Sequence, residues 1–293
     1  MGKTAVDPYD GSTAELAFVA KDQRGFPGEF EYYRGASGHI FIGEVPSNLS
    51  EHYEGGYQEI PKSEAELATQ AREDAYRLDL IKKLVPRGDY LEIGPWIGRV
   101  AYSAKKAGYN VSVIEMNDDC VSLMKRVGIH TIQSADPAQA LADDPMTYDV
   151  IGLWHSIEHL PRPWEVIDMA AKRLNEGGIL LVAGPNPESE QMKKLGKDWY
   201  HLDAPRHLYF LPAGVVEEIG RKNGLELLDA TTTDKLGKIL TDHGWHHEAI
   251  RRSRGSALIR RLVTRFFNWR EKARLSDQMH GAGYTVAMGR PQP

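Results

Sequence analysis

The sequence is poor in cysteine and has no long apolar run. Its 293 residues include a single cysteine, Cys120, which excludes an internal disulfide and any metal site built from several cysteines. No stretch approaches the ~20 consecutive apolar residues that a membrane-spanning helix needs. The first residues, MGKTAVDPYDGSTAE, lack the apolar core of a secretory signal. We therefore expect a cytoplasmic protein without a transmembrane segment.

A strong excess of charge of either sign is also missing. The formal net charge is −5, from 36 basic and 41 acidic side chains, so nothing points to nucleic acid as a partner. Hydrophobic residues make up 41% of the chain, which is enough for a proper core. The length allows one large domain with appendages or two small domains.

The residues up to about 61 carry short β-like runs, such as FEYYR and HIFI, without a helical period. The pattern changes at Ser63, where SEAE is a capping box that predicts the start of a helix. The helical pattern continues to Leu84, and Pro86 ends it. We therefore treat residues 1–61 as an N-terminal appendage.

Strand and helix patterns alternate after this point. The predicted strands are Tyr90–Ile93, Val111–Ile114, His130–Gln133, Tyr148–Trp154, Ile179–Ala183, the LELLDATT run and YTVAMG at 284–289. Helical stretches lie between most of them, for example Trp164–Leu174, closed by NEGG. Such alternation predicts a parallel sheet with helices on both faces.

The loop after the first of these strands, in YLEIGPWIGRV, has the form of a cofactor-binding turn. A dinucleotide fold needs G-x-G-x-x-G, and Trp96 and Arg99 occupy two of its glycine positions. The alternative pattern, acidic-x-G-x-G-x-G, is met by Glu92, Gly94 and Gly98 and broken only at Trp96. On this loop alone, a plain strand–turn–helix with two structural glycines remains an alternative.

Acidic residues at the ends of the next two strands favour a nucleoside cofactor. Glu115 follows an apolar run, 21 residues after Gly94, where a carboxylate can accept both ribose hydroxyls. Asp136 comes just after the third predicted strand. Its carboxylate is placed to accept a hydrogen bond from an adenine amino group.

Three further motifs complete a family resemblance. They are Glu158-His159-Leu160 after the fourth strand, Gly177-Gly178 before the fifth, and His207-Leu208-Tyr209-Phe210, one residue shorter than H-L-x-x-F. With them the chain resembles the class I S-adenosylmethionine-dependent methyltransferases over roughly residues 63–235 and the last strand. The resemblance implies an α/β, Rossmann-like, mostly parallel seven-stranded sheet. The implied division is an appendage over 1–61, a cofactor-binding core over 62–234, a basic helical insertion over 235–282 and the last strand over 283–293.

The resemblance implies S-adenosyl-L-methionine as cofactor. The residues expected to bind it are Glu92, Gly94, Trp96, Gly98, Glu115, Met116, Asp136 and Trp154. Because tryptophan lacks the freedom of glycine to take a positive φ, we expect an ordinary backbone conformation at Trp96. Its indole should then lie beside the methionine end of the cofactor or face the substrate.

Four histidines are candidates for catalysis, because a hydroxyl acceptor must lose a proton to a nearby base. They are His155, His159, His201 and His207, with His207 or His201 as the first choice. The sequence thus favours O-methylation of a small-molecule polar acceptor, such as a sugar, a glycan end or a secondary metabolite. C- or N-methylation and a non-catalytic cofactor-binding protein stay as alternatives. Asn186-Pro187 is followed by Glu188-Ser189, so the N-P-P-Y signature of base or amide N-methylation is missing.

No metal site is expected. The i, i+4 pairs His155/His159 and His243/His247 both lack the H-E-x-x-H pattern. The N-terminus is similar to the zinc ribbon of sugar C-methylating enzymes, but glycine stands at both cysteine positions, Gly35 and Gly38. Two-stranded structure there would have to pack on the core. Tyr53 and Tyr57 then either cover the substrate or belong to a plain surface or dimer contact.

A basic segment, Arg251 to Arg274, contains nine basic residues and one acidic residue, Glu271, with apolar residues at helical spacing. It predicts an amphipathic helix that packs on the core. Recognition of an anionic substrate or partner, contact with an anionic membrane surface, and a homodimer are left open.

Overall fold

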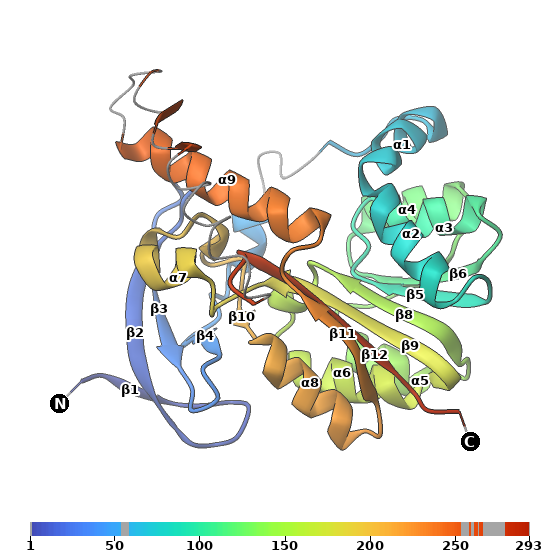
Figure 1. Ribbon diagram of the computed structural model, residues 1–293, viewed down its shortest axis with the longest axis horizontal. Coiled ribbons are helices and arrows are strands. Elements are labelled where there is room, and N and C mark those ends of the chain that lie inside the picture. The colour runs from blue at the N-terminus through green and yellow to red at the C-terminus, as the bar shows by residue number, and fades with distance from the viewer. Residues whose placement is uncertain are drawn as a thin grey trace.

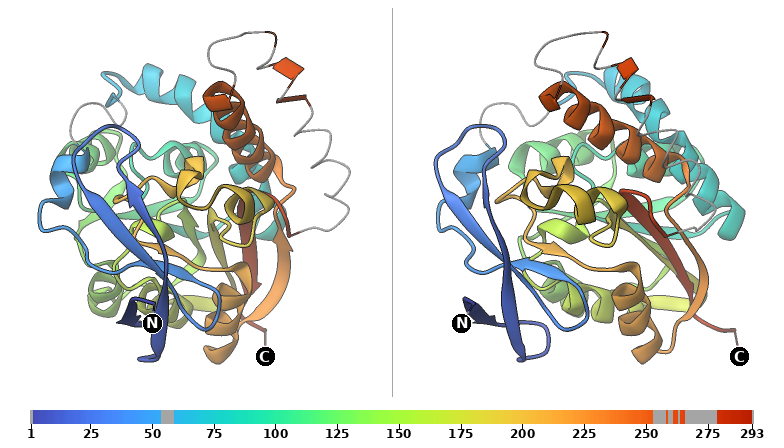
Figure 2. Two further views of the ribbon diagram at one scale, coloured as in Figure 1. Left: turned by 90° about the vertical axis from the view of Figure 1, so that its left-hand side faces the viewer. Right: turned by 60° about the vertical axis from the view of Figure 1, so that its left-hand side comes forward.

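The computed structural model describes residues 2–53, 59–252, 258, 261–262, 264–265 and 279–292. These residues form two β-sheets that lie beside one another, with helices around the larger one (Figure 1). In the two further views of Figure 2, the blue N-terminal strands stay against the same side of the core.

The larger sheet has seven strands in the spatial order β11-β12-β9-β8-β5-β6-β7. In chain order they are β5 (Asp89–Ile93), β6 (Asn110–Glu115), β7 (His130–Gln133), β8 (Tyr148–Trp154), β9 (Leu174–Pro185), β11 (Glu226–Thr231) and β12 (Gly283–Gly289). Strands β5 to β9 form a parallel set, in which every neighbouring pair is parallel. Strand β12 is antiparallel to both of its neighbours, β9 and β11. The predicted seven-stranded, mostly parallel sheet is confirmed.

Helices cover both faces of this sheet (Figure 1). One face carries α1 (Glu64–Ala71), α2 (Ala75–Leu84), α3 (Arg99–Lys106) and α4 (Asp118–Arg126). The other carries α5 (Pro137–Asp143), α6 (Pro163–Lys172) and α8 (Ala213–Lys222). Each helix turns an apolar stripe to the sheet; Val100, Ala101 and Ala104 of α3, for example, are almost fully buried. Two separate apolar cores result, one on each side of the sheet.

Two predicted boundaries differ from the structure. The helical stretch begins at Ser63, whose hydroxyl accepts a bond from Glu66 N at 3.2 Å, but the short helix η2 (Arg72–Asp74) interrupts it between α1 and α2. Strand β9 begins at Leu174 rather than at residue 179, because Leu174 pairs with Tyr148 of β8. NEGG therefore belongs to the strand and does not close the helix before it.

The smaller sheet has five antiparallel strands in the order β1-β2-β3-β4-β10. They are β1 (Thr4–Val6), β2 (Thr13–Lys21), β3 (Glu29–Arg34), β4 (Ile40–Ile42) and β10 (Tyr209–Phe210). The FEYYR and HIFI runs correspond to β3 and β4, and Gly35 and Gly38 lie in the turn between them, where Gly35 N donates to His39 O at 3.0 Å. The expected two-stranded ribbon is thus part of a larger sheet, and its last strand comes from beyond residue 200.

The segment between β9 and α8 lies against this smaller sheet. It contains α7 (Glu190–Leu195), η4 (Gly196–Asp198), η5 (Tyr200–Leu202) and β10. Trp199, Phe210 and Trp245 pack with Tyr32 and Phe41 in one buried cluster. Trp245 belongs to α9 (Lys235–Arg252). The N-terminal strands are therefore buried against the residues that follow the fifth strand of the core.

Part of the predicted basic helix, Arg251 to Arg274, falls outside the described residues, as does Tyr57. Within the described part of the chain, no helix has both the length and the apolar character that crossing a bilayer requires.

Candidate active site

The loop between β5 and α3 has three residues in the left-handed region. The φ angles are 64° at Gly94, 55° at Trp96 and 71° at Gly98. The ordinary conformation expected for Trp96 is therefore wrong. Its backbone N–H donates to Glu115 Oε2 at 3.1 Å, and this bond holds the residue in a conformation that costs a non-glycine residue about 1–2 kcal/mol. The Trp96 ring packs against the apolar core that α1 to α4 share.

Both glycines of this loop lie so close to other protein atoms that a Cβ would not fit. A Cβ on Gly94 would lie 2.7 Å from Cβ of Ser156, in the loop after β8. A Cβ on Gly98 would overlap the sulfur of Met124 in α4. Gly98, expected to bind the cofactor, therefore also has a packing role against α4. The loops after β5 and β8 are in direct contact, as expected where parallel strands end at one edge of a sheet.

Glu115 ends β6 and is buried. Its Oε1 accepts the N–H groups of Met116 and Asn117 at 2.8 and 2.9 Å, and its Oε2 accepts that of Trp96. Burial raises the pKa of Glu115, and these three N–H groups act against the rise. Oε2 accepts one of these bonds and has the capacity for a further donor. Met116 beside it has a relative exposure of 65%.

Glu92 lies in β5 just before the loop and is buried. Its Oε2 has no hydrogen-bond partner among the residues that the structure describes. Burial raises the pKa of Glu92 to about 8. On the neighbouring strand, Trp154 Nε1 donates to Tyr90 OH at 3.0 Å, so the polar edge of the Trp154 ring is already bonded within the core.

Asp136 is the N-cap of α5 and is partly buried. One carboxylate oxygen accepts Gln139 N at 3.1 Å, and the other accepts Arg162 Nη2 at 3.1 Å. Together with Ala135 and Leu160, these residues line a small hollow at the ends of β7 and β8. Asp136 therefore lies at the same edge as Glu115, already paired with a cation.

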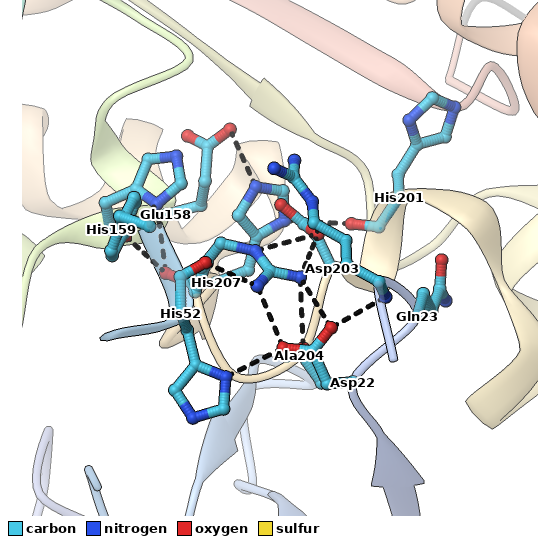
Figure 3. A network of polar contacts seen from close by, with 12 residues as sticks. Asp22, Gln23, His52, Glu158, His159, His201, Asp203, Ala204 and His207 are labelled. Carbon is cyan, nitrogen blue, oxygen red and sulfur yellow. Dashed lines mark hydrogen bonds and ion pairs between the residues drawn. The ribbon is translucent and has the colours of Figure 1, made fainter. Parts of the chain in front are cut away.

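Three of the four candidate histidines gather around Glu158, in η3 (Ile157–His159) after β8. His155 Nδ1 lies 3.2 Å from Glu158 Oε1, and His207 Nε2 lies 3.9 Å from the same oxygen. The rings of His159 and His207 meet edge to face, with centroids 4.7 Å apart. Figure 3 shows Glu158, His159 and His207 side by side.

The hydrogen bonds of these rings define their tautomers. His159 Nδ1 lies 2.9 Å from the carbonyl oxygen of Arg206, and His207 Nδ1 lies 2.9 Å from that of His201. A carbonyl oxygen can only accept, so both Nδ1 atoms carry a proton, and in the neutral form of each ring the lone pair is on Nε2. His155 Nδ1 donates to the Glu158 carboxylate in the same way.

Burial and neighbouring charge set the protonation of the cluster. Burial alone would raise the pKa of Glu158, but the hydrogen bond of His155 and the surrounding imidazoles lower it to about 2. Burial, helped by the proximity of His159, lowers the pKa of His207 to about 4. At neutral pH the cluster therefore contains a carboxylate and a neutral His207.

His201 does not join this cluster. Its Nε2 donates to Leu240 O of α9 at 2.8 Å, and its ring points away from Glu158 and His207 (Figure 3). Burial lowers the pKa of His201 to about 3. Of the two histidines preferred from the sequence, only His207 faces the carboxyl ends of the strands.

Sequence reasoning missed the network that holds this loop. The Arg206 guanidinium is fully buried and donates to both oxygens of Asp22, at 2.9 and 3.1 Å, and to Asp203 at 2.7 Å. His52 Nδ1 is 2.7 Å from the same Asp22 carboxylate. Tyr53, expected either over the substrate or in a surface or dimer contact, donates to Arg206 O at 3.3 Å and is 3.1 Å from His159 Nδ1. No local pattern connects Asp22 to Arg206, because 184 residues separate them.

Comparison with known proteins assigns the core. A family profile described as a methyltransferase domain matches residues 66–230, more than half of the chain. The ubiquinone biosynthesis O-methyltransferase of Hydrogenovibrio crunogenus is 29% identical over 178 residues, which are 54% of this chain and 71% of that protein. The enzyme of that name from Xylella fastidiosa is 30% identical over 117 residues, or 38% of this chain and 48% of that protein, so the chain spans about half of that relative.

Solved structures share the fold at low sequence identity. An S-adenosylmethionine-dependent methyltransferase from Archaeoglobus fulgidus has a TM-score of 0.50 and 16% identity, covering 75% of this chain and 94% of that one. Phosphoethanolamine N-methyltransferase 2 from Haemonchus contortus, in complex with S-adenosyl-L-methionine, has a TM-score of 0.51 and 16% identity, covering 86% and 62%.

Proposed function

The chain belongs to the class I S-adenosylmethionine-dependent methyltransferases, and from this premise we propose that it methylates an oxygen of a small polar acceptor, with His155 as the general base. The cofactor is S-adenosyl-L-methionine, which supplies a methyl group on a sulfonium. The acceptor that we propose is a sugar, a glycan end or a secondary metabolite. The protein's own task is then to position the acceptor and to take up its proton.

The residues around the β5 loop fit this cofactor. Glu115 Oε2 has the capacity to accept a ribose hydroxyl, and the exposed Met116 beside it offers an apolar surface for adenine. Asp136 lies at the same edge, next to the hollow that it lines. Glu92 Oε2, buried and without a partner in the described part of the chain, suits the cationic end of the cofactor, whose charge favours release of the proton that the raised pKa of Glu92 retains at neutral pH. We propose these four residues as the cofactor's contacts.

The observation that carries the proposal is the pair of His155 and Glu158. Its geometry is that of a base oriented by a carboxylate: Nδ1 donates to Glu158, so Nε2 is the nitrogen that carries the lone pair when the ring is neutral. That Nε2 is buried and has no hydrogen-bond partner among the described residues. The φ of His155 is 56°, and such strain in a non-glycine residue is concentrated at functional sites. His155 also directly follows β8, beside Ser156, which contacts Gly94 of the β5 loop.

Oxygen is the acceptor atom that most needs this base, because a hydroxyl must lose its proton as the new bond forms. The names of both relatives, as O-methyltransferases, agree with this choice. Transfer to nitrogen or carbon is the alternative outcome of the test.

The test compares His155→Gln with the unchanged protein in a methyl-transfer assay, using S-adenosylmethionine labelled in its methyl group. Catechols, free sugars and amines serve as acceptors, and NMR of the product identifies the methylated atom. We expect an O-methyl product and a fall in turnover of about 10²–10⁴-fold, the usual share of a general base. Affinity for S-adenosylmethionine should stay unchanged.

His246→Gln is the matched control, because His246 is exposed on α9 and should not affect turnover. A fall of less than about threefold in His155→Gln, far below the usual share of a base, would remove His155 from this role. A product methylated on nitrogen or carbon would overturn the proposed acceptor atom.

A further inference from the structure

We propose that Glu158, His159 and His207 bind one divalent transition-metal ion of the zinc class. One ligand atom from each of the three side chains lies within 4.8 Å of the other two. Glu158 and His207 are buried and His159 is partly buried. The three residues come from two segments, η3 after β8 and the stretch just before β10, which the fold brings together (Figure 3).

Both imidazoles are prepared to bind a metal through Nε2. Each holds its Nδ1 proton against a backbone carbonyl, that of Arg206 for His159 and that of His201 for His207. Metal-binding histidines characteristically make this outer hydrogen bond, which fixes the tautomer and the direction of the ring. The Nε2 atom of each ring is therefore a lone-pair donor.

Glu158 supplies the negative charge. Its Oε1 accepts the His155 proton, while Oε2 is buried and, across the described ranges, has no hydrogen-bond partner. A buried carboxylate oxygen without a donor is unfavourable in itself, and a cation would satisfy it. Two imidazoles and one carboxylate form a donor set typical of zinc and similar ions.

The site needs only a small contraction to hold an ion. Tetrahedral zinc with bonds of about 2.0–2.2 Å places its ligand atoms roughly 3.3 Å apart. The three ligand atoms lie within 4.8 Å of one another, and the Glu158 oxygen that already accepts from His155, Oε1, is 3.9 Å from His207 Nε2. Rotations within the side chains, including that of the Glu158 carboxylate to present Oε2, can close the difference. The bond from Leu208 N to Glu158 O, at 2.7 Å, meanwhile holds the two backbone segments together.

Three protein ligands leave a fourth position open, and that position suits an oxygen of the acceptor. A hydroxyl bound to the metal loses its proton more easily, and His155 is adjacent to receive it. This step rests on the proposed function, whereas the binding of the metal does not. The acceptor that best uses both groups carries two neighbouring oxygens, as a catechol or a sugar diol does.

The test measures metal binding directly. The full-length protein is stripped with a chelator and titrated with cobalt(II), followed by visible absorption, and with zinc, followed by calorimetry. We expect one equivalent to bind. The variants Glu158→Gln and His207→Gln should each weaken binding at least tenfold, while far-UV circular dichroism and S-adenosylmethionine affinity report whether they fold. Zinc should also raise the melting temperature of the unchanged protein, a readout that needs no variant.

The matched control removes the exposed i, i+4 pair on α9 in the double variant His243→Gln/His247→Gln, since surface histidines can take up zinc adventitiously. This variant should keep its equivalent of metal. Three results would each overturn the inference. They are loss of the metal in this control, retention of the metal in both site variants, and the absence of saturable binding to the unchanged protein. If metal binds while His155→Gln retains full turnover, the metal site stands and the proposed base falls. If no metal binds and His155→Gln is inactive, the proposed base stands and the metal site falls.

Discussion

At the scale of single residues, Glu92 combines a cost to stability with the role in cofactor binding that we propose for it. Its pKa is raised to about 8 in the folded protein against about 4.3 in an unfolded chain. The folded state therefore holds a proton that the unfolded state releases between these values. The contribution of Glu92 to stability should be fully present below about pH 4 and should be lost as the pH rises to about 8. Each unit of difference is worth about 1.4 kcal/mol, so the loss amounts to a few kcal/mol.

Glu92→Gln should remove this pH dependence, because glutamine does not titrate. Without ligand, the variant should be more stable than the unchanged protein at pH 9, by on the order of a few kcal/mol, while S-adenosylmethionine binding weakens. Urea unfolding at pH 5 and pH 9 measures the first effect and calorimetry the second. Glu218→Gln, at an exposed carboxyl of α8 paired with Lys222, is the control. An equal loss of stability between pH 5 and 9 in Glu92→Gln and the unchanged protein would contradict the assignment.

Glu115 offers a second test of the cofactor site. Glu115→Ala should weaken S-adenosylmethionine binding by about 1–3 kcal/mol, the range for losing hydrogen bonds to a charged group. The same change leaves the N–H groups of Trp96, Met116 and Asn117 without this acceptor, so the melting temperature should fall as well. A titration that gives unchanged affinity would show that the ribose binds elsewhere.

At the scale of elements, the Asp22–Arg206 ion pair connects the end of β2 to the loop that carries His207. The carbonyl oxygen of Arg206 also accepts the His159 proton, so a shift of Arg206 moves both imidazoles. Breaking a buried pair on one side typically costs about 3–5 kcal/mol, because the remaining charge is left uncompensated. This network therefore determines both the stability and the geometry of the histidine cluster.

Asp22→Asn should accordingly lower the free energy of unfolding by a few kcal/mol and reduce turnover with little change in S-adenosylmethionine affinity. Glu29→Gln is the control in the same sheet, since its pair with Lys21 is exposed and is worth at most about 1 kcal/mol. Chemical denaturation and single-turnover assays provide the two readouts. If Asp22→Asn and Glu29→Gln behave alike, the pair does not position the loop.

At the scale of the whole molecule, the two sheets should unfold together. Partly buried hydrogen bonds join the N-terminal sheet to the segment that connects β9 and α8 of the core, from Tyr32 OH to His207 O at 2.9 Å and from Gln23 Nε2 to Trp199 O at 2.8 Å. The strand β10 also belongs to the smaller sheet, although in the sequence it stands between β9 and β11 of the larger sheet. We therefore regard the predicted boundary at residue 61 as a boundary in sequence, not as one between independently stable domains.

Differential scanning calorimetry should then show one cooperative transition, which S-adenosylmethionine shifts upward as a whole. Near-UV circular dichroism, which reports aromatic packing in both sheets, should follow the same curve. An earlier transition confined to the aromatic signal and insensitive to the cofactor would mean that the N-terminal sheet melts separately.

The sequence by itself determined the elements of the core and the residues at its strand ends. Apolar runs, the capping box at Ser63 and the glycines of the β5 loop are local signals, and they act over a few residues in any context. They placed Glu92 and Glu115 at the ends of β5 and β6. They also placed His155 and His159 around the end of β8, because a parallel sheet aligns the ends of its strands.

Only the tertiary structure decided what these residues meet. The positive φ of Trp96 depends on its bond to Glu115 from another strand, and the separation of His201 from His207 depends on where α9 lies. The pairing of Asp22 with Arg206, the addition of β10 to the N-terminal sheet and the grouping of Glu158 with His207 join segments that are far apart in the chain. Such contacts leave no periodic or local trace in the sequence, because each one follows from the packing of complete elements against one another.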